Sequence, residues 1–356
     1  MNSLVEFWNE QCAVKRPLEG DSWLRRLLNR HVVGTLLNAF PRAATGMFSL
    51  SRGELARRVC VDKEGGSYRV FQAMYAYDDP RARGDLLNRL LMESPAAKAA
   101  RNRRTIAQGM LEACLRDCPN SRVSENGTVP LGTKANAGPT LVMAVGGGDG
   151  SLEAEVISRA ANPNVYYCSV DKDETAVEAN RRVMAQNGLA GKGFVFTGDV
   201  AKTNDFGAVV EAARRRFDVS FDGIGIAVCH GIAEYLDLGR RGNDAFARLL
   251  QGIRAAMRPE GSLVISHTDY HDRVKFVERG LQWQMRLRSL EELETEIQKA
   301  GWQIVVCEHE PMKLITLCLA VQSNRPRVRI DGPSQLRHSR TSQPARATIS
   351  AGVVGQ

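Results

Sequence analysis

The first part of the chain is patterned for helices that bury one face. Over residues 23–40, apolar side chains recur three or four positions apart, with arginine and asparagine between them. The apolar set is Leu24, Leu27, Leu28, Val32 and Leu36. A second pattern of this kind covers residues 82–118, and Pro95 is where a helix there would break. We therefore expect long amphipathic helices in this region.

A short segment with a capping signal separates these two patterns. Ser51 precedes Glu54 by three positions, which is the spacing of a helix capping box. The segment could belong to a helix-turn-helix unit, but any packed helical domain gives this pattern, so it does not predict a DNA reader. We expect residues 1–120 to form a helical domain that covers an active site or supplies a dimer surface.

From residue 140 to residue 322, short apolar runs alternate with amphipathic stretches. The expected strands are residues 140–145, 164–171, 193–198, 223–229, 261–267, 302–310 and 313–321. This alternation predicts a mostly parallel sheet with helices on both faces. The last two runs are separated by far fewer residues than the roughly dozen that a parallel crossover needs, so we expect them to pair antiparallel.

Two polar stretches flank the predicted sheet. Residues 121–139 are rich in turn-forming residues and are expected to be a linker. Residues 323–356 are rich in Ser, Pro, Thr and Arg, and we expect them to be a disordered basic tail. Because the arginines of this tail supply most of the net charge of +8, the charge does not predict a nucleic-acid-binding surface.

The sequence gives no sign of a membrane span or a secretion signal. No apolar run approaches the roughly 18 residues that a transmembrane helix needs. The first residues carry acids where a signal peptide carries bases. The eight cysteines are scattered, without the paired spacing of zinc ligands. We expect a cytoplasmic protein with reduced thiols.

The strongest chemical signal is a glycine-rich turn between the first expected strand and the helix after it. It consists of Gly146, Gly147, Gly148, Asp149 and Gly150. Glycines let the backbone turn sharply and approach a ligand closely, and a helix N-terminus offers free N–H groups. The turn therefore predicts a nucleotide-type cofactor at the carboxyl end of the sheet, the alternative being a tight turn without a ligand.

Two aspartates at the ends of the next strands extend this prediction. Asp171 could accept hydrogen bonds from ribose hydroxyls, and its alternative role is the N-cap of the following helix. Asp199 lies where the amino group of an adenine would be met, and its alternative role is that of a turn residue.

The order of these motifs resembles that of class I S-adenosylmethionine-dependent methyltransferases. The resemblance is carried by VGGGDG, VDKD, TGDV, the pair Cys229-His230 and MRPEGSLVISH, and it covers about residues 140–322. It implies an α/β fold with a Rossmann-like seven-stranded sheet that ends in an antiparallel hairpin, and S-adenosylmethionine (SAM) as cofactor. One departure is Ala144, which stands where many members have an acid that contacts the cofactor's amino group.

The resemblance also implies which residues contact the cofactor. The glycine turn would line its methionine part, the acid after the second strand its ribose, and the segment after the third strand its adenine. The residues so assigned are Gly146, Gly147, Gly148, Asp149, Gly150, Asp171, Asp199, Val200 and Cys229. The stretch QWQMRLRSL is further similar to a bacterial family of methyltransferases, from which no substrate is carried over.

Candidates for the transfer step follow the fourth and fifth strands, which flank the cofactor's methyl group in this architecture. His230 could shape the methyl pocket, act as a base, or merely cap a strand or helix. Tyr235 lies in the same loop, and His271 in the next. The spacing His267-x-Asp269-x-His271 would suit a metal on an extended strand, but without a further partner we expect no metal.

Three other functions compete with methyl transfer. An NAD-dependent dehydrogenase requires Gly-x-Gly-x-x-Gly or -Ala, whereas the frame that starts at Gly146 ends in Ser151. An aminopropyltransferase of the spermidine synthase type carries paired acids after the fourth strand, where this chain reads IAVCHGIAEYL. A SAM-binding scaffold without catalysis is the third. We expect methyl transfer to a small-molecule acceptor rather than to nucleic acid, with a homodimer as a possible assembly.

Overall fold

The computed structural model describes residues 18–117, 138–202, 205–238, 244–271 and 275–323. Nearly all of the expected linker (121–139) and of the expected disordered tail (323–356) lies outside these residues. The residues described all belong to one compact unit. None of the helices among them is long and apolar enough to cross a membrane.

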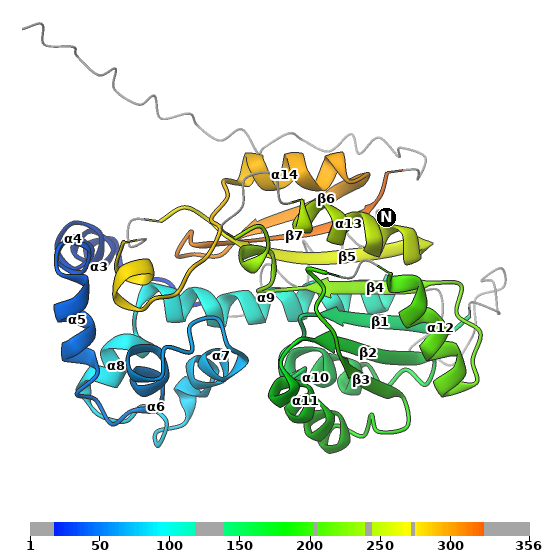
Figure 1. The fold of residues 1–356 in the computed structure, drawn as a ribbon, viewed down its shortest axis with the longest axis horizontal. Coiled ribbons are helices and arrows are strands. Elements are labelled where there is room, and N and C mark those ends of the chain that lie inside the picture. The colour runs from blue at the N-terminus through cyan, green and yellow to red at the C-terminus, as the bar shows by residue number, and fades with distance from the viewer. Residues whose placement is uncertain (1–17, 118–137, 203–204, 239–243, 272–274, 324–356) are drawn as a thin grey trace, which may run out of the picture. The chain divides into compact units, whose positions relative to one another are not determined.

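Seven strands form a single sheet (Figure 1). They are β1 (Thr140–Val145), β2 (Val165–Asp171), β3 (Gly193–Thr197), β4 (Ile224–Cys229), β5 (Met257–Thr268), β6 (Trp302–His309) and β7 (Ile315–Gln322). Their order across the sheet is β3-β2-β1-β4-β5-β7-β6. The pairs among β1 to β5 are parallel, whereas β7 runs antiparallel to both β5 and β6. The predicted Rossmann-like sheet with an antiparallel final hairpin is confirmed.

The central strands are almost entirely apolar because helices cover both of their faces. Every residue of β1 and of β4 is buried, as expected for strands in the middle of a parallel sheet. The fifth strand starts earlier than predicted, at Met257 rather than at Gly261. Pro259 and Glu260 suggest a turn, but the chain stays extended there, and the register of β4 against β5 shifts between Ile224 and Ile226.

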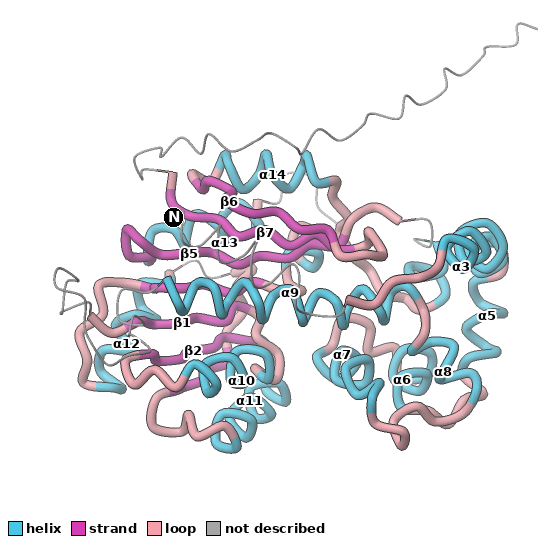
Figure 2. The backbone as a smooth tube through the Cα atoms, turned by 180° about the vertical axis from the view of Figure 1, so that it is seen from behind, coloured by secondary structure: helices cyan, strands magenta, loops and turns pink. Residues whose placement is uncertain are grey.

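Two sets of three helices cover the two faces of the sheet. One face packs against α12 (Phe206–Phe217), α13 (Ala245–Ala256) and α14 (Leu290–Lys299). The other packs against α9 (Pro95–Asp117), α10 (Ser151–Ala160) and α11 (Glu174–Gln186). Figure 2 shows α9 lying against this face of the sheet and running along the direction of the strands. The last helix of the expected N-terminal region is thus part of the layer that covers the sheet.

The remaining N-terminal elements are α3 (Trp23–Leu28), a π-helical turn (Asn29–Val33), α4 (Gly34–Ala39), α5 (Pro41–Phe48), α6 (Glu54–Ala56), a second π-helical turn (Arg57–Val61), α7 (Tyr68–Tyr75), a 3-10 turn (Ala76–Asp78) and α8 (Leu86–Met92). The elements from α4 to α8 build a third apolar core, to which none of the described side chains of α3 and the first π-helical turn contributes. The segment after β5 joins this core through Phe276, Leu281 and Trp283. The predicted break at Pro95 is confirmed, because α8 ends at Met92 and α9 begins at Pro95.

Two expectations about these helices are wrong. The N-cap of α6 is Gly53, without a side-chain cap, and Ser51 instead donates its hydroxyl to Asp85 Oδ1 at 2.7 Å. The apolar face expected to be buried in α3 and α4 is about half exposed, with Leu24 at 52% and Leu36 at 56%. Helical spacing identifies apolar residues that share one face of a helix, but it does not show whether another element buries that face.

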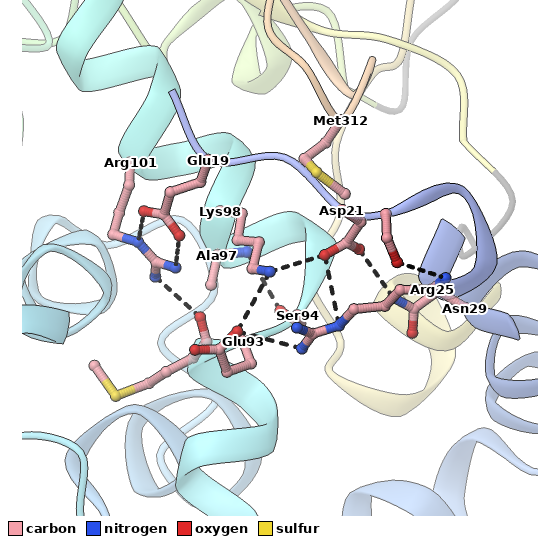
Figure 3. A network of polar contacts seen from close by, with 12 residues as sticks. Glu19, Asp21, Arg25, Asn29, Glu93, Ser94, Ala97, Lys98, Arg101 and Met312 are labelled. Atoms are coloured by element: carbon pink, nitrogen blue, oxygen red, sulfur yellow. Dashed lines mark hydrogen bonds and ion pairs between the residues drawn. The ribbon is translucent and has the colours of Figure 1, made fainter. Parts of the chain in front are cut away.

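An ion-pair network fastens the segment before α3 to α9 (Figure 3). Lys98 Nζ lies 2.8 Å from Asp21 Oδ1, and both side chains are buried. The same ammonium group lies 3.3 Å from Glu93 Oε2. One turn further along α9, the Arg101 guanidinium binds both carboxylate oxygens of Glu19. Charged groups, rather than apolar contacts alone, therefore hold this segment against the long helix.

Candidate functional site

A cavity of about 410 Å³ opens at the carboxyl ends of the parallel strands. Its walls include residues 146–149 after β1, 171–173 after β2, 198–201 after β3 and 230–232 after β4. The strand order reverses between β1 and β4, which is the switch point where open α/β sheets bind ligands. The volume lies in the range of about 300–1,000 Å³ that is typical of small-molecule sites.

The glycine-rich turn between β1 and α10 forms part of the cavity wall. Gly146 and Gly148 have φ angles of 63° and 56°, a region that glycine adopts without steric cost. A Cβ on Gly146 would lie 2.3 Å from Ile232 Cδ1, and one on Gly147 would lie 2.4 Å from Ser169 Oγ. The turn therefore requires glycine both for its backbone angles and for its close packing.

Asp171 lies at the end of β2 and lines the cavity. Its Oδ2 accepts a hydrogen bond from Gly148 N–H at 2.9 Å, and its Oδ1 accepts one from Asp173 N–H at 3.0 Å. Each carboxylate oxygen still has a lone pair for a ligand hydroxyl. The alternative role as helix N-cap is wrong for Asp171, because Asp173 caps α11 by accepting from Thr175 N–H.

Asp199 and Val200 line the cavity beyond β3. Asp199 Oδ1 accepts a hydrogen bond from Ala201 N–H at 3.1 Å, and Oδ2 lies 3.2 Å from Lys202 Nζ. Asp199 therefore stabilises the turn after β3, as its alternative role predicts, and it also lines the cavity.

His230 follows β4 and lines the cavity, with 14% of its side chain exposed. Its Nδ1 lies 3.5 Å from Glu153 Oε1. Burial, helped by the positive charges of Arg103 and Arg104, lowers the pKa of His230 to about 3. The imidazole is therefore neutral at neutral pH and accepts a proton only weakly.

Tyr235 lies in a 3-10 turn (Ala233–Tyr235) and also lines the cavity. Its hydroxyl accepts a hydrogen bond from Trp283 Nε1 at 2.9 Å. Burial and the neighbouring Glu234 raise the pKa of this hydroxyl well above its usual value. Tyr235 therefore stays protonated and can donate a hydrogen bond into the cavity.

Three predicted site residues do not belong to the cavity wall. Cys229 is fully buried in β4 and is part of the apolar core. Gly150 adopts a φ of 64° as the N-cap of α10, behind the lining residues. His271 follows β5, outside the set of residues that line the cavity.

The residues considered as metal ligands, His267, Asp269 and His271, do not form a metal site in the structure. Asp269 Oδ2 accepts a hydrogen bond from Thr316 Oγ1 at 2.6 Å and lies 3.4 Å from His309 Nδ1. His267 is fully buried, and neither of its ring nitrogens has a hydrogen-bond partner. No cluster of three or more His, Cys, Asp or Glu side chains that could hold a metal ion occurs among the residues described.

The N-terminal helices supply cavity residues that the sequence analysis missed. Tyr68, Phe71 and Tyr75 of α7 line the cavity next to the glycine turn. Gln72 on the same helix donates its Nε2 to Asp149 Oδ2 at 2.6 Å, which ties α7 to the turn. These contacts join positions far apart in sequence, so no local sequence pattern predicts them.

Two buried charged residues on the cavity wall were also missed, although each leaves a sequence signal. Arg103 is 2% exposed and shares the buried face of α9 with Ile106 and Ala107. Glu153 is fully buried and shares the buried face of α10 with Val156. A charge within an apolar row at helical spacing is the pattern that could have identified them.

The loop after β4 is held in place by Arg288, from the MRLRS stretch singled out in the sequence. Arg288 is 1% exposed. Its Nη1 donates to the Ala233 carbonyl at 3.0 Å, and its Nη2 lies 3.0 Å from Asp237 Oδ2. The stretch therefore positions the segment that carries His230 and Tyr235.

Comparison with known proteins relates this arrangement to a family. Residues 133–322 match the model of a family described as "Putative methyltransferase". A search of curated protein sequences finds no significant match. Among solved structures, a "possible exported protein" from Bordetella parapertussis has a TM-score of 0.58 at 18% identity, with 90% of this chain and 96% of that chain covered. An O-methyltransferase family protein from Burkholderia thailandensis has a TM-score of 0.41 at 15% identity, with 72% and 63% covered.

Proposed function

The chain belongs to the methyltransferase family whose model matches residues 133–322, and from this premise we propose that it transfers a methyl group from SAM to a small-molecule acceptor. The observation that carries the proposal is the cavity at the switch point of the sheet, where the glycine turn, Asp171 and Asp199 share one wall. This is the place at which α/β sheets of this kind bind nucleotide cofactors.

The residues of the cavity fit SAM. A side chain at Gly146 would meet Ile232, which also lines the cavity, so the absence of a side chain there keeps room for a ligand close to the backbone. Carboxylates on the wall, among them Asp149, Asp171 and Asp199, suit a ligand that carries positive charge and hydroxyl donors.

Each part of the cofactor has residues of this chain that would hold it. The glycine turn and Asp149 would hold the methionine part, Asp171 the ribose hydroxyls, and Asp199 with Val200 the adenine. When bound, SAM supplies an electrophilic methyl group on its sulfonium sulfur. Cys229 and Gly150 support this wall from behind rather than touching the ligand.

His230 and Tyr235 would orient the acceptor beside the methyl group. Because its pKa is lowered to about 3, His230 is better suited to shaping the pocket and accepting a hydrogen bond than to removing a proton at neutral pH. Tyr235 stays protonated and would donate a hydrogen bond to the acceptor. Their contribution is placement of the nucleophile in line with the methyl group.

A small acceptor fits the size and lining of the site. The cavity must hold the cofactor within about 410 Å³, which leaves room for a compact acceptor group. Phe71 and Tyr75 would cover the acceptor from the N-terminal helices, so this region acts as a cover of the active site. The proposal includes a cytoplasmic location, which cell fractionation would test.

Aminopropyl transfer is less well supported by the same geometry. It requires acids after β4 that bind and deprotonate an amine. The acid at that place is Glu234, which is buried and accepts hydrogen bonds from Arg103 and Thr268. It is therefore engaged within the protein.

Release of S-adenosylhomocysteine (SAH) is the test, because every SAM-dependent methyl transfer produces it whichever acceptor is used. The purified protein is incubated with SAM and a library of small nucleophiles. We expect SAH above the acceptor-free level for at least one chemical class, and none with a Gly148→Val variant. SAH binding without release across the library would favour a scaffold, and methylthioadenosine from decarboxylated SAM and putrescine would favour aminopropyl transfer.

A further inference from the structure

Glu153 is a fully buried carboxylate on the wall of the cavity. It is the third residue of α10, the helix that begins directly after the glycine turn. Neither of its two carboxylate oxygens has a hydrogen-bond partner. Burying a carboxylate without a partner is costly. A ligand that binds in the cavity and donates hydrogen bonds to these two oxygens would offset this cost.

The neighbours of Glu153 do not neutralise it. The closest titratable nitrogen is His230 Nδ1, 3.5 Å from Glu153 Oε1, and His230 is neutral at neutral pH. Arg104 is engaged elsewhere, because its guanidinium donates to Ser151 Oγ and to Glu155 Oε1 at 2.7 Å each. Within the described part of the chain, the carboxylate thus has no permanent cationic partner within ion-pair distance.

The strand that leads into the glycine turn lacks an acid. Ala144 is fully buried in β1, two residues before the glycine turn. In the methyltransferases that this chain resembles, many members have at this place the acid that contacts the cofactor's amino group. A Cβ on Gly147 would lie 2.9 Å from Ala144 Cβ, so the turn packs down onto the small side chain. The ammonium contact must therefore come from another residue.

We propose that Glu153 binds the α-ammonium group at the methionine end of the cofactor, in place of the acid that is absent at Ala144. The inference rests on the proposed function, because it takes SAM or SAH as the ligand of the cavity. An ammonium group offers three donors, and the two free oxygens of Glu153 are acceptors. The resulting hydrogen bonds are charge-assisted, which makes them stronger than those between neutral groups.

The test compares SAH with a desamino analogue in which hydrogen replaces the α-amino group. Calorimetric titrations are made with the wild type, with Glu153→Gln, and with Glu178→Gln as a matched control. Glu178 is an exposed carboxylate on α11 that pairs with Arg181. We expect the wild type and the control to prefer SAH by about tenfold to a hundredfold, the range for a hydrogen bond to a charged group. Glu153→Gln should reduce this preference to about threefold or less and leave binding of the analogue unchanged.

A second readout uses the wild type alone and does not depend on the folding of a variant. Burial raises the pKa of Glu153 to about 7. Since only the carboxylate form pairs with an ammonium group, the affinity for SAH should fall by up to about tenfold per pH unit below pH 7, while the analogue shows no such fall. The groups that face Glu153 from the surrounding elements are Arg104, Asp149, Glu155, Tyr167, Cys229 and His230.

The outcomes separate this inference from the proposed function. If the wild type binds SAH and the desamino analogue equally well, or if Glu153→Gln keeps the preference, Glu153 does not bind the ammonium group and the methyltransferase proposal stands. If the wild type binds neither ligand, the proposed function fails, and the inference fails with it.

Discussion

At the scale of single residues, backbone conformation decides which residues the glycine-rich turn can contain. Gly150 combines a φ of 64° with close packing, since a Cβ there would lie 2.4 Å from the side-chain amide of Asn180. That amide is itself fixed, because Asn180 Nδ2 donates to Tyr167 Oη at 3.1 Å. The effect of the backbone angle and the effect of the close packing can be separated experimentally. Gly188 has a similar φ of 73°, but a Cβ added there would meet no atom within 4 Å.

We predict that Gly150→Ala destabilises the protein more than Gly188→Ala does. The left-handed backbone angle alone should cost about 1 kcal/mol in each variant. At Gly150 the clash with Asn180 should add about 1–3 kcal/mol. Urea unfolding of both variants measures the difference, and equal losses would show that the contact with Asn180 relaxes freely.

His267 gives a prediction about pH. It is fully buried, and burial, with the charges of Arg288 and Arg286, lowers its pKa to about 3. Between about pH 6.5 and pH 3 the unfolded chain therefore binds a proton that the folded protein does not bind, so the free energy of unfolding falls as the pH falls through this window.

Replacing His267 with phenylalanine should remove this contribution. Relative to the wild type, His267→Phe should gain about 2 kcal/mol of stability between pH 7 and pH 5, because each pH unit below about 6.5 counts for about 1.4 kcal/mol. Urea unfolding at the two pH values measures this change. Parallel pH dependences for the two proteins would contradict it.

At the scale of elements, the strands could be predicted and the packing of the N-terminal helices could not. Most strands are apolar runs with glycine or aspartate at or next to one end, so local sequence places them closely, although β5 begins earlier than predicted. The helices depend on partners far away in the chain. Thus Ser51 binds Asp85 rather than capping α6, and Leu24 and Leu36 share a helical face that stays half exposed.

The attachment of the N-terminal segment to α9 gives a prediction at this scale. Lys98→Met removes the ammonium group that faces the buried Asp21 carboxylate at 2.8 Å. Among the described side chains, Asp21 then keeps only Asn29 and the half-exposed Arg25, whose Nε lies 3.5 Å from Asp21 Oδ1. Because a buried carboxylate that loses its buried cationic partner is costly, we expect a loss of up to about 3 kcal/mol in the free energy of unfolding. The double variant Asp21→Asn/Lys98→Met should recover more than half of it. Chemical denaturation tests both, and additive losses in the double variant would argue against a coupled pair.

At the scale of the whole molecule, the cavity has two halves, and only one of them could be predicted from the sequence. One half follows strands β1 to β4, where motifs in the sequence predict it. The other half comes from α7 and α9, whose Tyr68, Phe71 and Arg103 reach the cavity only through the tertiary fold. Sequence reasoning therefore predicted the turn and the aspartates that line the cavity, and it expected a helical cover, but it did not predict which residues of these helices or which buried charges lie on the cavity wall.

Calorimetric titration of the wild-type protein with SAH tests the central claim most directly, with NAD and decarboxylated SAM as comparison ligands. We predict one SAH site per chain, at least tenfold tighter than the site for either comparison ligand. At about 100 times its dissociation constant, SAH should raise the free energy of unfolding by about 2.7 kcal/mol. Absence of SAH binding, or NAD binding of equal strength, would contradict the assignment of this cavity to a methyltransferase cofactor.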